Sequence, residues 1–205
     1  MAFSRETIQR LMDGIRRRVT GLAPPMSQLL VKEYGRDPFV ILISCLLSLR
    51  ARDVVTYPIS QLLLKRARTP QALRAIPLDQ LETLLYPLGF YRRKAQVLHD
   101  VSDALLDRFG GVVPSSEEEL LSLPGVGRKT ANLVRAEAFE IPAICVDTHV
   151  HRLANYLGLV STKTPEETEY ALQKIIPEEY WIDINRLLVT CGQNRCDLSA
   201  LRLVK

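Results

Sequence analysis

The feature that most constrains the fold is the spacing of apolar residues, which recur every three or four positions along almost the whole chain. This period matches one face of an α-helix, and the alternation typical of a half-buried β-strand is scarce. Pro and Gly clusters interrupt the pattern where helices should end or restart. The sequence therefore predicts an all-α fold. Helices are expected at 5–20, 25–33, 38–50, 53–65, 70–75, 78–86, 91–108, 117–122, 128–139, 148–157, 166–175 and 179–190.

Composition limits the class of protein. The 205 residues, 47% hydrophobic and 24% charged, suit one or two globular domains and argue against a disordered chain. The sequence contains no run of about 18 apolar residues, so it does not predict a membrane span. Residues 1–6 lack the apolar core of a secretory signal, so we expect an intracellular protein. The net charge of +4 only weakly favours a polyanionic partner.

The most informative segment is a tight turn between two expected helices. Pro124 should end the first helix, and Gly125 and Gly127 permit positive φ angles and close approach by another backbone. The following helix N-terminus favours a phosphate through its unpaired amide groups and its dipole. A bare turn of this kind is also compatible with an ordinary helical hairpin. The residues expected to bind one DNA strand are Gly125, Val126, Gly127, Arg128 and Thr130.

The residues around this turn carry a family resemblance. The run Leu-Pro-Gly-Val-Gly-Arg-Lys-Thr-Ala-Asn at 123–132 is followed by Val-Asp-Thr-His-Val at 146–150. Together they closely resemble the helix-hairpin-helix and Gly-Pro-Asp signature of the endonuclease III family of base-excision repair glycosylases. The resemblance spans about residues 25–196.

The resemblance implies a two-domain architecture. A six-helix, barrel-like domain is expected at 31–141, with the helix-hairpin-helix at about 117–139. A second helical domain is expected from 1–30 together with 142–205. The active site would lie in the cleft between the two.

The same resemblance implies that Lys129 attacks the sugar C1′ of a damaged nucleotide. The base then leaves, and a Schiff base permits β-elimination 3′ to the abasic site. A helix at 128–139 would be about 18 Å long, and 140–146 can extend about 23 Å, so Asp147 can return toward Lys129. We expect Asp147 to act on the sugar or as a proton shuttle, and helix capping is the alternative as its sole role.

A lysine attacks only as the free amine, whereas its ordinary pKa near 10.4 keeps it protonated at neutral pH. A position in the first turn of a helix disfavours the cation by about 0.3–1 kcal/mol, which is less than one pKa unit. Helix placement is therefore insufficient. Burial against an apolar wall and the neighbouring Arg128 are expected to contribute the rest.

Two further segments resemble the family loops that open the duplex. In 47–53, Arg50 stands where the family usually has Gln, and its planar group of donors could stack and hydrogen-bond to the orphaned base. In 88–95, Phe90 stands where an apolar side chain pries a base step apart, although a core aromatic is the structural alternative. Other expected DNA-binding residues are Tyr91, Lys94 and His149.

The cysteines predict no metal site. Cys45 and Cys145 have apolar neighbours and should be buried. Most close relatives end in four cysteines that hold a 4Fe–4S cluster, and Cys196 resembles the first, but Leu203 stands where the second should be. We therefore expect no cluster and no cofactor, with Cys191 and Cys196 as a free thiol pair. A zinc site from Cys145, His149 and His151 lacks a familiar spacing.

The sequence thus predicts a bifunctional DNA glycosylase and abasic-site lyase for oxidised pyrimidines. Its expected partner is double-stranded DNA with damaged bases or abasic sites, and we expect a monomer associated with the nucleoid and not with a membrane. One alternative is a glycosylase for mismatches or other bases, against which Lys129 argues because several of those enzymes lack this lysine. The other is a non-catalytic DNA-binding module, which would need neither Lys129 nor Asp147.

Overall fold

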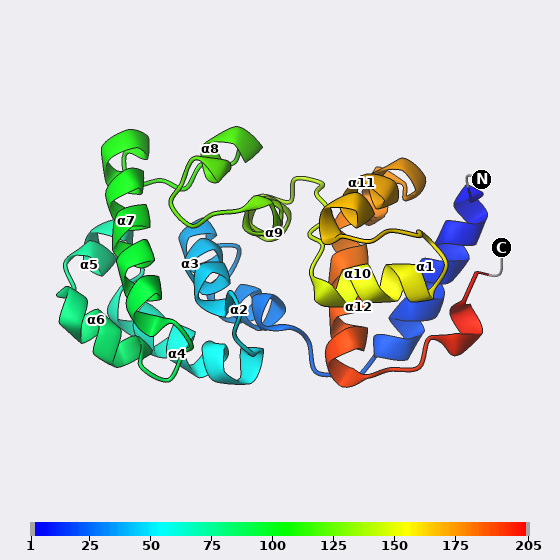
Figure 1. Cartoon of the computed structure of the whole chain (residues 1–205), viewed down its shortest axis with the longest axis horizontal. Coiled ribbons are helices and arrows are strands. Elements are labelled where there is room, and N and C mark those ends of the chain that lie inside the picture. The colour runs from blue at the N-terminus through cyan, green and yellow to red at the C-terminus, as the bar shows by residue number, and fades with distance from the viewer. Residues whose placement is uncertain (1–2, 204–205) are drawn as a thin grey trace. The chain divides into compact units, whose positions relative to one another are not determined.

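The computed structural model describes residues 3–203, and this part of the chain is helical without a β-strand (Figure 1). The expectation of an all-α fold is therefore confirmed. No helix in this range is long and apolar enough to cross a membrane. The α-helices are α1 Arg5–Val19, α2 Met26–Tyr34, α3 Pro38–Ser48, α4 Asp53–Arg66, α5 Pro70–Arg74, α6 Leu78–Leu85, α7 Tyr91–Phe109, α8 Glu117–Leu121, α9 Arg128–Ala138, α10 Thr148–Tyr156, α11 Pro165–Ile175 and α12 Trp181–Asn194. Two 3-10 helices are η1 Glu178–Tyr180 and η2 Ser199–Leu201.

Half of the twelve α-helices in the described part of the chain begin where the sequence supplies a capping side chain. The cap hydroxyl or carboxylate accepts a hydrogen bond from a backbone N–H of the first turn, which has no partner within the helix. Prolines occupy the first position of α3, α5 and α11, where their missing N–H costs nothing. The side-chain caps are Ser4, Asp37, Thr69, Ser116, Asp147 and Thr164.

The chain divides into two compact units, which we call the hairpin unit, Met26–Phe139, and the terminal unit, Met1–Pro25 with Glu140–Lys205. The boundary expected at 30/31 would have cut α2, but α2 packs on α3 and belongs to the hairpin unit. That unit contains α2 to α9. Two of these helices have only five residues and the other six are longer, whereas a six-helix domain was expected. Residues 1–2 and 204–205 of the expected second domain lie outside the described range.

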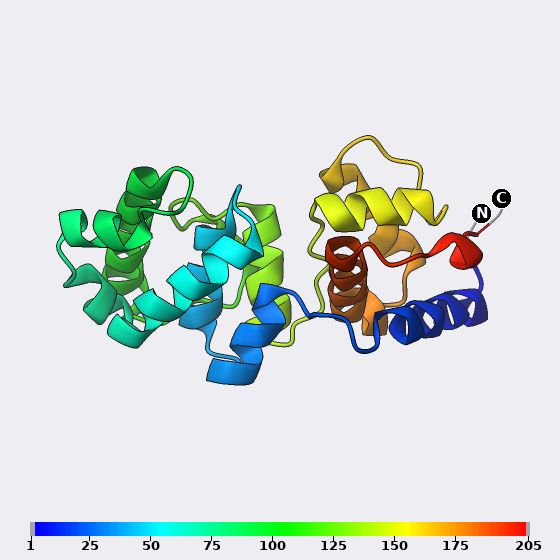
Figure 2. The same cartoon turned by 90° about the horizontal axis from the view of Figure 1, so that it is seen from below.

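The hairpin unit is built around α3. Residues 39–47 of this helix are buried without interruption, so the helix has no solvent-facing side over most of its length. α2, α4 and α9 pack against it, and α5 and α6 pack against α7 (Figures 1 and 2). A helix that is apolar on every face is stable only at the centre of a core.

The terminal unit is organised around α12, against which α1 and α10 pack. Arg16 in α1 pairs with Asp183 in α12 at 2.7 Å, and Arg18 donates to the backbone oxygen of Asp197. Residues 198–203 follow α12 and lie along α1, as both views show. The two ends of the sequence thus build one core.

Candidate active site

The hairpin turn joins α8 to α9 and depends on one glycine. Gly125 has φ +72°, and a Cβ there would lie 2.7 Å from Cγ1 of Val97. Gly127 does not have the positive φ that the sequence suggested: its backbone is extended (φ −100°, ψ 175°), and it forms the N-cap of α9. A Cβ on Gly127 would meet no atom within 4 Å, so this position leaves open space next to the helix N-terminus.

The turn offers backbone rather than side chains to a bound strand. The side chains of Val126 and Thr130, both expected to bind DNA, are buried. No side chain caps α9 at Gly127. An uncapped helix N-terminus presents amide groups and the positive end of the helix dipole, which suits a phosphate. Residues 126 and 130 can therefore contribute to binding only through their main chain.

Lys129 lies in the first turn of α9 with an exposed side chain. Its neighbour Arg128 forms an ion pair with Glu117 at 3.3 Å, and Arg135 binds the other carboxylate oxygen of Glu117 at 3.2 Å. The expected burial of the lysine against an apolar wall is therefore wrong for the protein alone. The positive charge of Arg128, which was expected to disfavour the protonated form of Lys129, is partly balanced by the negative charge of Glu117.

Lys129 interacts electrostatically with buried Cys45, in a neighbourhood that also includes two carboxylates, Glu137 and Asp53, which the sequence analysis missed. Burial raises the pKa of the Cys45 thiol to about 12; Lys129 acts to lower this pKa, and the carboxylates of Glu137 and Asp53 act to raise it. All four groups thus belong to one electrostatic neighbourhood within the hairpin unit. In the sequence, the acidic residue Asp53 at the start of α4 was the one signal that could have pointed to this neighbourhood.

The two carboxylates are held firmly. Both oxygens of Glu137 accept hydrogen bonds from Nε2 of Gln28, at 2.9 and 2.8 Å, and Arg36 donates to the Glu137 backbone oxygen at 2.8 Å. Asp53 accepts from the backbone N–H of Met26 at 3.1 Å. These bonds join α2 to α9 and α4, and so fix the helix that carries Lys129.

Asp147 is the N-cap of α10 in the terminal unit. Its Oδ1 accepts a hydrogen bond from the Val150 N–H at 2.8 Å, so the capping role weighed in the sequence analysis is present. Among the described residues no hydrogen bond to Oδ2 is recorded, and this oxygen can accept another donor. The neighbouring His149 is half-buried, and its ring packs so closely on Gly192 that a Cβ there would overlap it.

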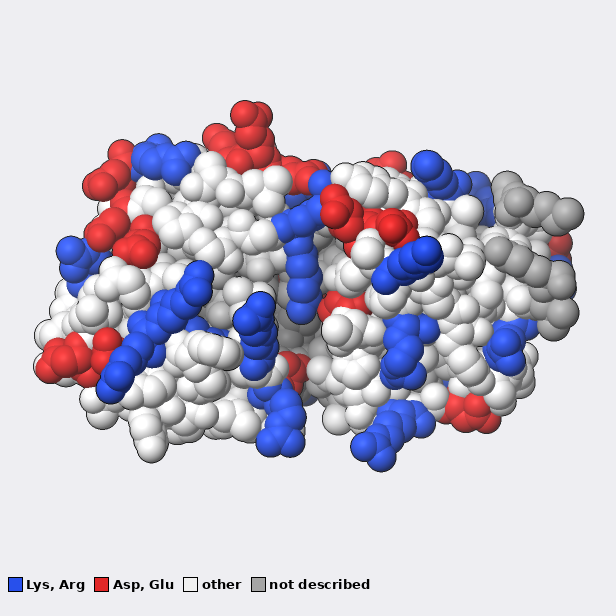
Figure 3. All heavy atoms as spheres, in the orientation of Figure 1, with Lys and Arg blue, Asp and Glu red and all other residues white. Residues whose placement is uncertain are grey.

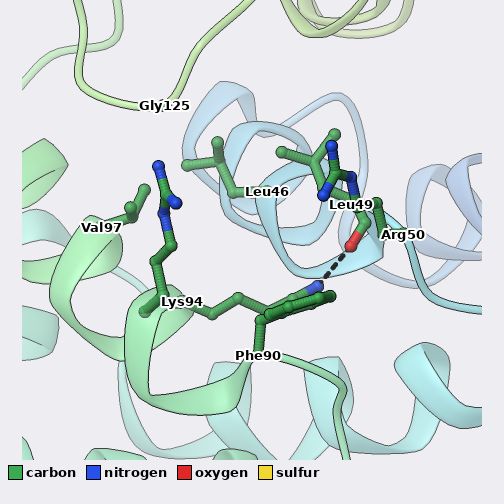
Figure 4. Close-up of a pocket in the computed structure, with 8 residues that line it drawn as sticks. Leu46, Leu49, Arg50, Phe90, Lys94, Val97 and Gly125 are labelled. Carbon is green, nitrogen blue, oxygen red and sulfur yellow. Dashed lines mark hydrogen bonds between the residues drawn. The ribbon is translucent and has the colours of Figure 1, made fainter.

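Arg50 and Phe90 line one pocket of the hairpin unit (Figure 4). The pocket has a volume of about 280 Å3, and its walls come from the end of α3, the start of α7 and the hairpin turn. Phe90 is 64% exposed, so the alternative that it is a core aromatic is wrong. Both residues have positive φ angles, +54° for Arg50 and +58° for Phe90. The lining residues are Leu46, Leu49, Arg50, Phe90, Arg93, Lys94, Val97 and Gly125.

Two other residues expected to bind DNA at the second loop have contacts within the protein. Tyr91 stacks edge-on against Tyr86, with ring centroids 5.5 Å apart, and the Arg92 guanidinium lies over its ring. The Lys94 side chain is only 8% exposed, and its Nζ donates to two backbone oxygens of the protein. The Lys94 ammonium group is therefore bound within the protein, and its direct contact with DNA stays a prediction that these bonds do not favour.

Charge is unevenly distributed on the face drawn in Figure 3. Acidic side chains gather over α8, whose first turn is Glu117, Glu118 and Glu119. Lys and Arg side chains are spread over the rest of this face of the hairpin unit. The acidic first turn suits the α8 dipole, and strands of DNA would avoid it.

The C-terminal cysteines do not fit a 4Fe–4S cluster. Cys191 and Cys196 are joined by a disulfide, so the expectation of a free thiol pair is wrong in this structure. Cys45 and Cys145 form no disulfide and are buried, as expected, and Cys45 belongs to the other unit. Leu203 donates its N–H to the Leu157 oxygen and packs on the core. Within residues 3–203, no three His, Cys, Asp or Glu side chains gather as metal ligands.

Comparison with protein families matches residues 43–178 to the HhH-GPD superfamily of base excision DNA repair proteins. The matched stretch includes the hairpin turn, Lys129 and Asp147. The helical fold and this match define the class: a helix-hairpin-helix protein of base excision repair.

Similar proteins and similar solved structures narrow this class to one family. Endonuclease III of Thermotoga maritima is 48% identical over 172 residues, which cover 82% of this chain and 81% of that protein. Endonuclease III of Escherichia coli is 36% identical, covering 78% of this chain and 76% of that protein. A non-covalent endonuclease III–DNA complex matches with a TM-score of 0.82 at 34% identity, covering 93% of this chain and 86% of that one.

A trapped covalent endonuclease III–DNA intermediate matches with a TM-score of 0.77 at 33% identity, over 94% of this chain and 87% of that one. The chain belongs to the endonuclease III family. Its activity is that of a DNA glycosylase with abasic-site lyase activity in base excision repair.

The two turn glycines should respond differently to alanine. Gly125→Ala places a Cβ at positive φ and against Val97, so we expect a loss of about 1–3 kcal/mol in the free energy of unfolding. Gly127→Ala should leave this free energy within about 0.5 kcal/mol of wild type but weaken DNA binding, because the new Cβ lies where a strand would approach. Urea unfolding and duplex binding measure the two effects. Equal destabilisation by both variants would contradict this assignment.

The buried thiol gives a second prediction. Only the thiolate is alkylated, and the pKa of Cys45 near 12 leaves almost none at pH 8. Iodoacetamide at pH 8 should therefore leave Cys45 unmodified in the native protein and modify it in urea, as peptide mass spectrometry can show. Rapid modification of Cys45 in the native protein would mean that this side of α9 is open to solvent.

Proposed function

We propose that Lys129 is the nucleophile of both the glycosylase and the lyase steps. The observation that supports this role is an exposed lysine in the first turn of α9, directly after a turn suited to hold a phosphate. A strand gripped at the turn would bring a sugar within reach of this amine. Lysines serve as nucleophiles towards sugar and carbonyl carbons through Schiff bases.

The reaction follows from the chemistry of an amine. Nζ of Lys129 forms a bond to C1′, the glycosidic bond breaks, and its electron pair leaves with the base, which takes up a proton. The attacking amine gives up one proton, the ring oxygen takes up a proton as the sugar ring opens, and the product is a protonated Schiff base that still carries one N–H. Loss of the C2′ proton then expels the 3′ phosphate, which cuts the strand by β-elimination. Water finally releases Lys129.

The exposure of Lys129 adds a condition. The protein alone does not bury the amine, so a bound strand must displace the water around it before the free amine becomes favourable. We propose that substrate binding supplies this desolvation.

We propose that Asp147 has two roles. Oδ1 caps α10, and Oδ2 accepts a proton from, or a hydrogen bond of, the reacting sugar. The capping bond holds the carboxylate in one rotamer, which favours a defined position for the second oxygen. A carboxylate near an opening sugar ring also stabilises positive charge at C1′.

DNA binding is proposed to have a gripping part and an opening part. Main-chain groups of the turn, at Gly125, Val126 and Gly127, would hold phosphates irrespective of sequence. Arg50 and Phe90 would enter the duplex where the target nucleotide leaves, Arg50 facing the orphaned base. Tyr91 follows Phe90 along the chain and His149 lies near Asp147, but both are held by protein contacts, so their contribution would be smaller.

Oxidised pyrimidines are the substrate that we propose, acted on by a monomer in the nucleoid. The proposal is supported by the likeness to endonuclease III over most of the chain and by the lysine that a purely monofunctional glycosylase does not need. A panel of duplexes with one thymine glycol, dihydrouracil, mismatched thymine or alkylated purine tests it. Faster release of the mismatched or alkylated base than of the oxidised pyrimidines would overturn it.

Substitution of the two proposed catalytic residues gives the third prediction. Lys129→Ala should lower nicking of an abasic-site duplex at least about a hundredfold and abolish borohydride trapping. Asp147→Asn should also lower nicking about a hundredfold while folding normally, because Asn is as good an N-cap as Asp. Lys174→Ala, an exposed lysine in α11, is the control. If Asp147→Asn nicks as fast as wild type, capping is its sole role; if Lys129→Ala is still trapped, the nucleophile is another amine.

We also propose that helix packing holds the terminal unit together without an iron–sulfur cluster. This proposal gives the fourth prediction. The purified protein should be colourless, contain no stoichiometric iron and keep its nicking activity in a chelator. A visible band typical of iron–sulfur proteins, with iron bound in whole-number ratio, would contradict this expectation.

A further inference from the structure

Lys94 carries a buried charge that neither the fold nor the proposed chemistry has yet explained. It ends the first turn of α7, and burial lowers the pKa of its ammonium group. The dipole of α7 also disfavours a cation at this end of the helix. Among the described residues no carboxylate forms an ion pair with Lys94. A cation kept under these conditions needs a specific partner.

The partners are two carbonyl groups at the end of α3. Nζ of Lys94 donates to the backbone oxygen of Leu47 at 2.5 Å and to that of Leu49 at 2.7 Å. The last carbonyls of a helix have no partner within the helix, and a charged donor binds them more strongly than a neutral one. Figure 4 shows the Lys94 side chain reaching from α7 to the Leu49 oxygen.

These carbonyls lie directly before a strained residue. Arg50 has φ +54°, a conformation that costs a side chain with a Cβ about 1–2 kcal/mol. The turn around it is closed by the Ala51 N–H, which donates to the Ser48 oxygen at 3.0 Å. Lys94 thus holds the chain on the N-terminal side of Arg50, at the two carbonyls that flank Ser48. Strain of this kind persists only where surrounding contacts determine the backbone.

The same lysine is connected to the second loop. Its backbone N–H donates to the Phe90 oxygen at 3.0 Å, and Phe90 also has a positive φ angle of +58°. Arg50 and Phe90 come from segments 40 residues apart in sequence, yet both line the pocket beside Lys94. One residue therefore binds the backbone of both loops, through its side chain on one side and its main chain on the other.

We propose that Lys94 is a positioning residue for strand opening, whose buried ammonium group holds the Arg50 turn in register with Phe90 so that both enter the duplex together. This inference rests on the proposed function of Arg50 and Phe90. A preformed pair needs no ordering when DNA binds, so more of the binding free energy remains for unstacking the base. Lys94 itself does not touch the DNA.

The fifth prediction separates this role from general stability. Lys94→Met keeps the apolar stem and removes the three N–H donors, whereas Lys94→Arg keeps a cation with several donors. The matched control is Lys32→Met, which changes an exposed lysine in α2. The measured quantity is the ratio of dissociation constants for an undamaged duplex and for the same duplex with a tetrahydrofuran abasic analogue. Neither duplex is cut, so the result does not depend on Lys129.

We expect Lys94→Met to lower this ratio about tenfold, as for the loss of a charge-assisted hydrogen bond, with the undamaged duplex bound within about twofold of wild type. The ratio for Lys94→Arg should be closer to the wild-type ratio, and the ratio for Lys32→Met should equal the wild-type ratio. The fluorescence of 2-aminopurine opposite the analogue should fall in parallel with the ratio, because fewer complexes have an opened duplex. Equal losses on both duplexes, or an unchanged ratio, would overturn the positioning role.

A double-mutant cycle covers the case in which Lys94→Met folds poorly. If Lys94 acts through the two loops, its substitution should change the ratio little once Arg50→Ala and Phe90→Ala are present, and Lys94→Gln, which removes the charge but stays polar, can replace Lys94→Met in the cycle. Additive effects would overturn the inference. A wild-type ratio near one would instead reject the proposed strand opening by Arg50 and Phe90, on which the inference rests.

Discussion

The structure of the hairpin unit depends on the complete burial of one helix. Residues 39–47 of α3 have no polar face, so α2, α4 and α9 must cover the helix for it to leave water. That requirement decides where the chemistry lies. Cys45 of α3 lies in the electrostatic neighbourhood of Lys129 on α9, and the end of α3 delivers Arg50 to the pocket. The packing of an apolar helix thus places both the amine and the opening loop.

Much of this could be predicted from the sequence, for identifiable reasons. Helix starts were predictable because capping residues and first-turn prolines act locally, as at Asp37 and Thr164. The exceptions depend on tertiary contacts. The extended backbone of Gly127 follows from its role as N-cap, and the burial of Lys94 requires carbonyls that lie more than forty residues away. A lysine next to two arginines looks like a solvated face until its partners are known.

Apolar contacts of its last described residues complete the core of the terminal unit. Leu198 is buried, Leu201 fits against Gly14 of α1, and the Leu203 oxygen lies where Gly158 has no side chain. These contacts connect the end of the sequence to both α1 and the turn after α10. Apolar burial contributes in proportion to area and needs no particular ligand geometry. Three leucines can therefore hold this segment, while the disulfide between Cys191 and Cys196 closes the turn before it.

The exposure of Lys129 changes the way in which its reactivity must be understood. A buried amine would be held in its neutral, nucleophilic form before substrate arrives, at the expense of burying a polar group in the folded protein. An exposed amine keeps its hydration, and Glu117 moderates the charge of the adjacent Arg128. Activation then becomes part of binding, because only a strand that closes over α9 removes the water. In the proposed mechanism, an undamaged duplex, in which the base remains stacked within the helix, cannot bring C1′ to the amine, so discrimination and activation arise from the same step.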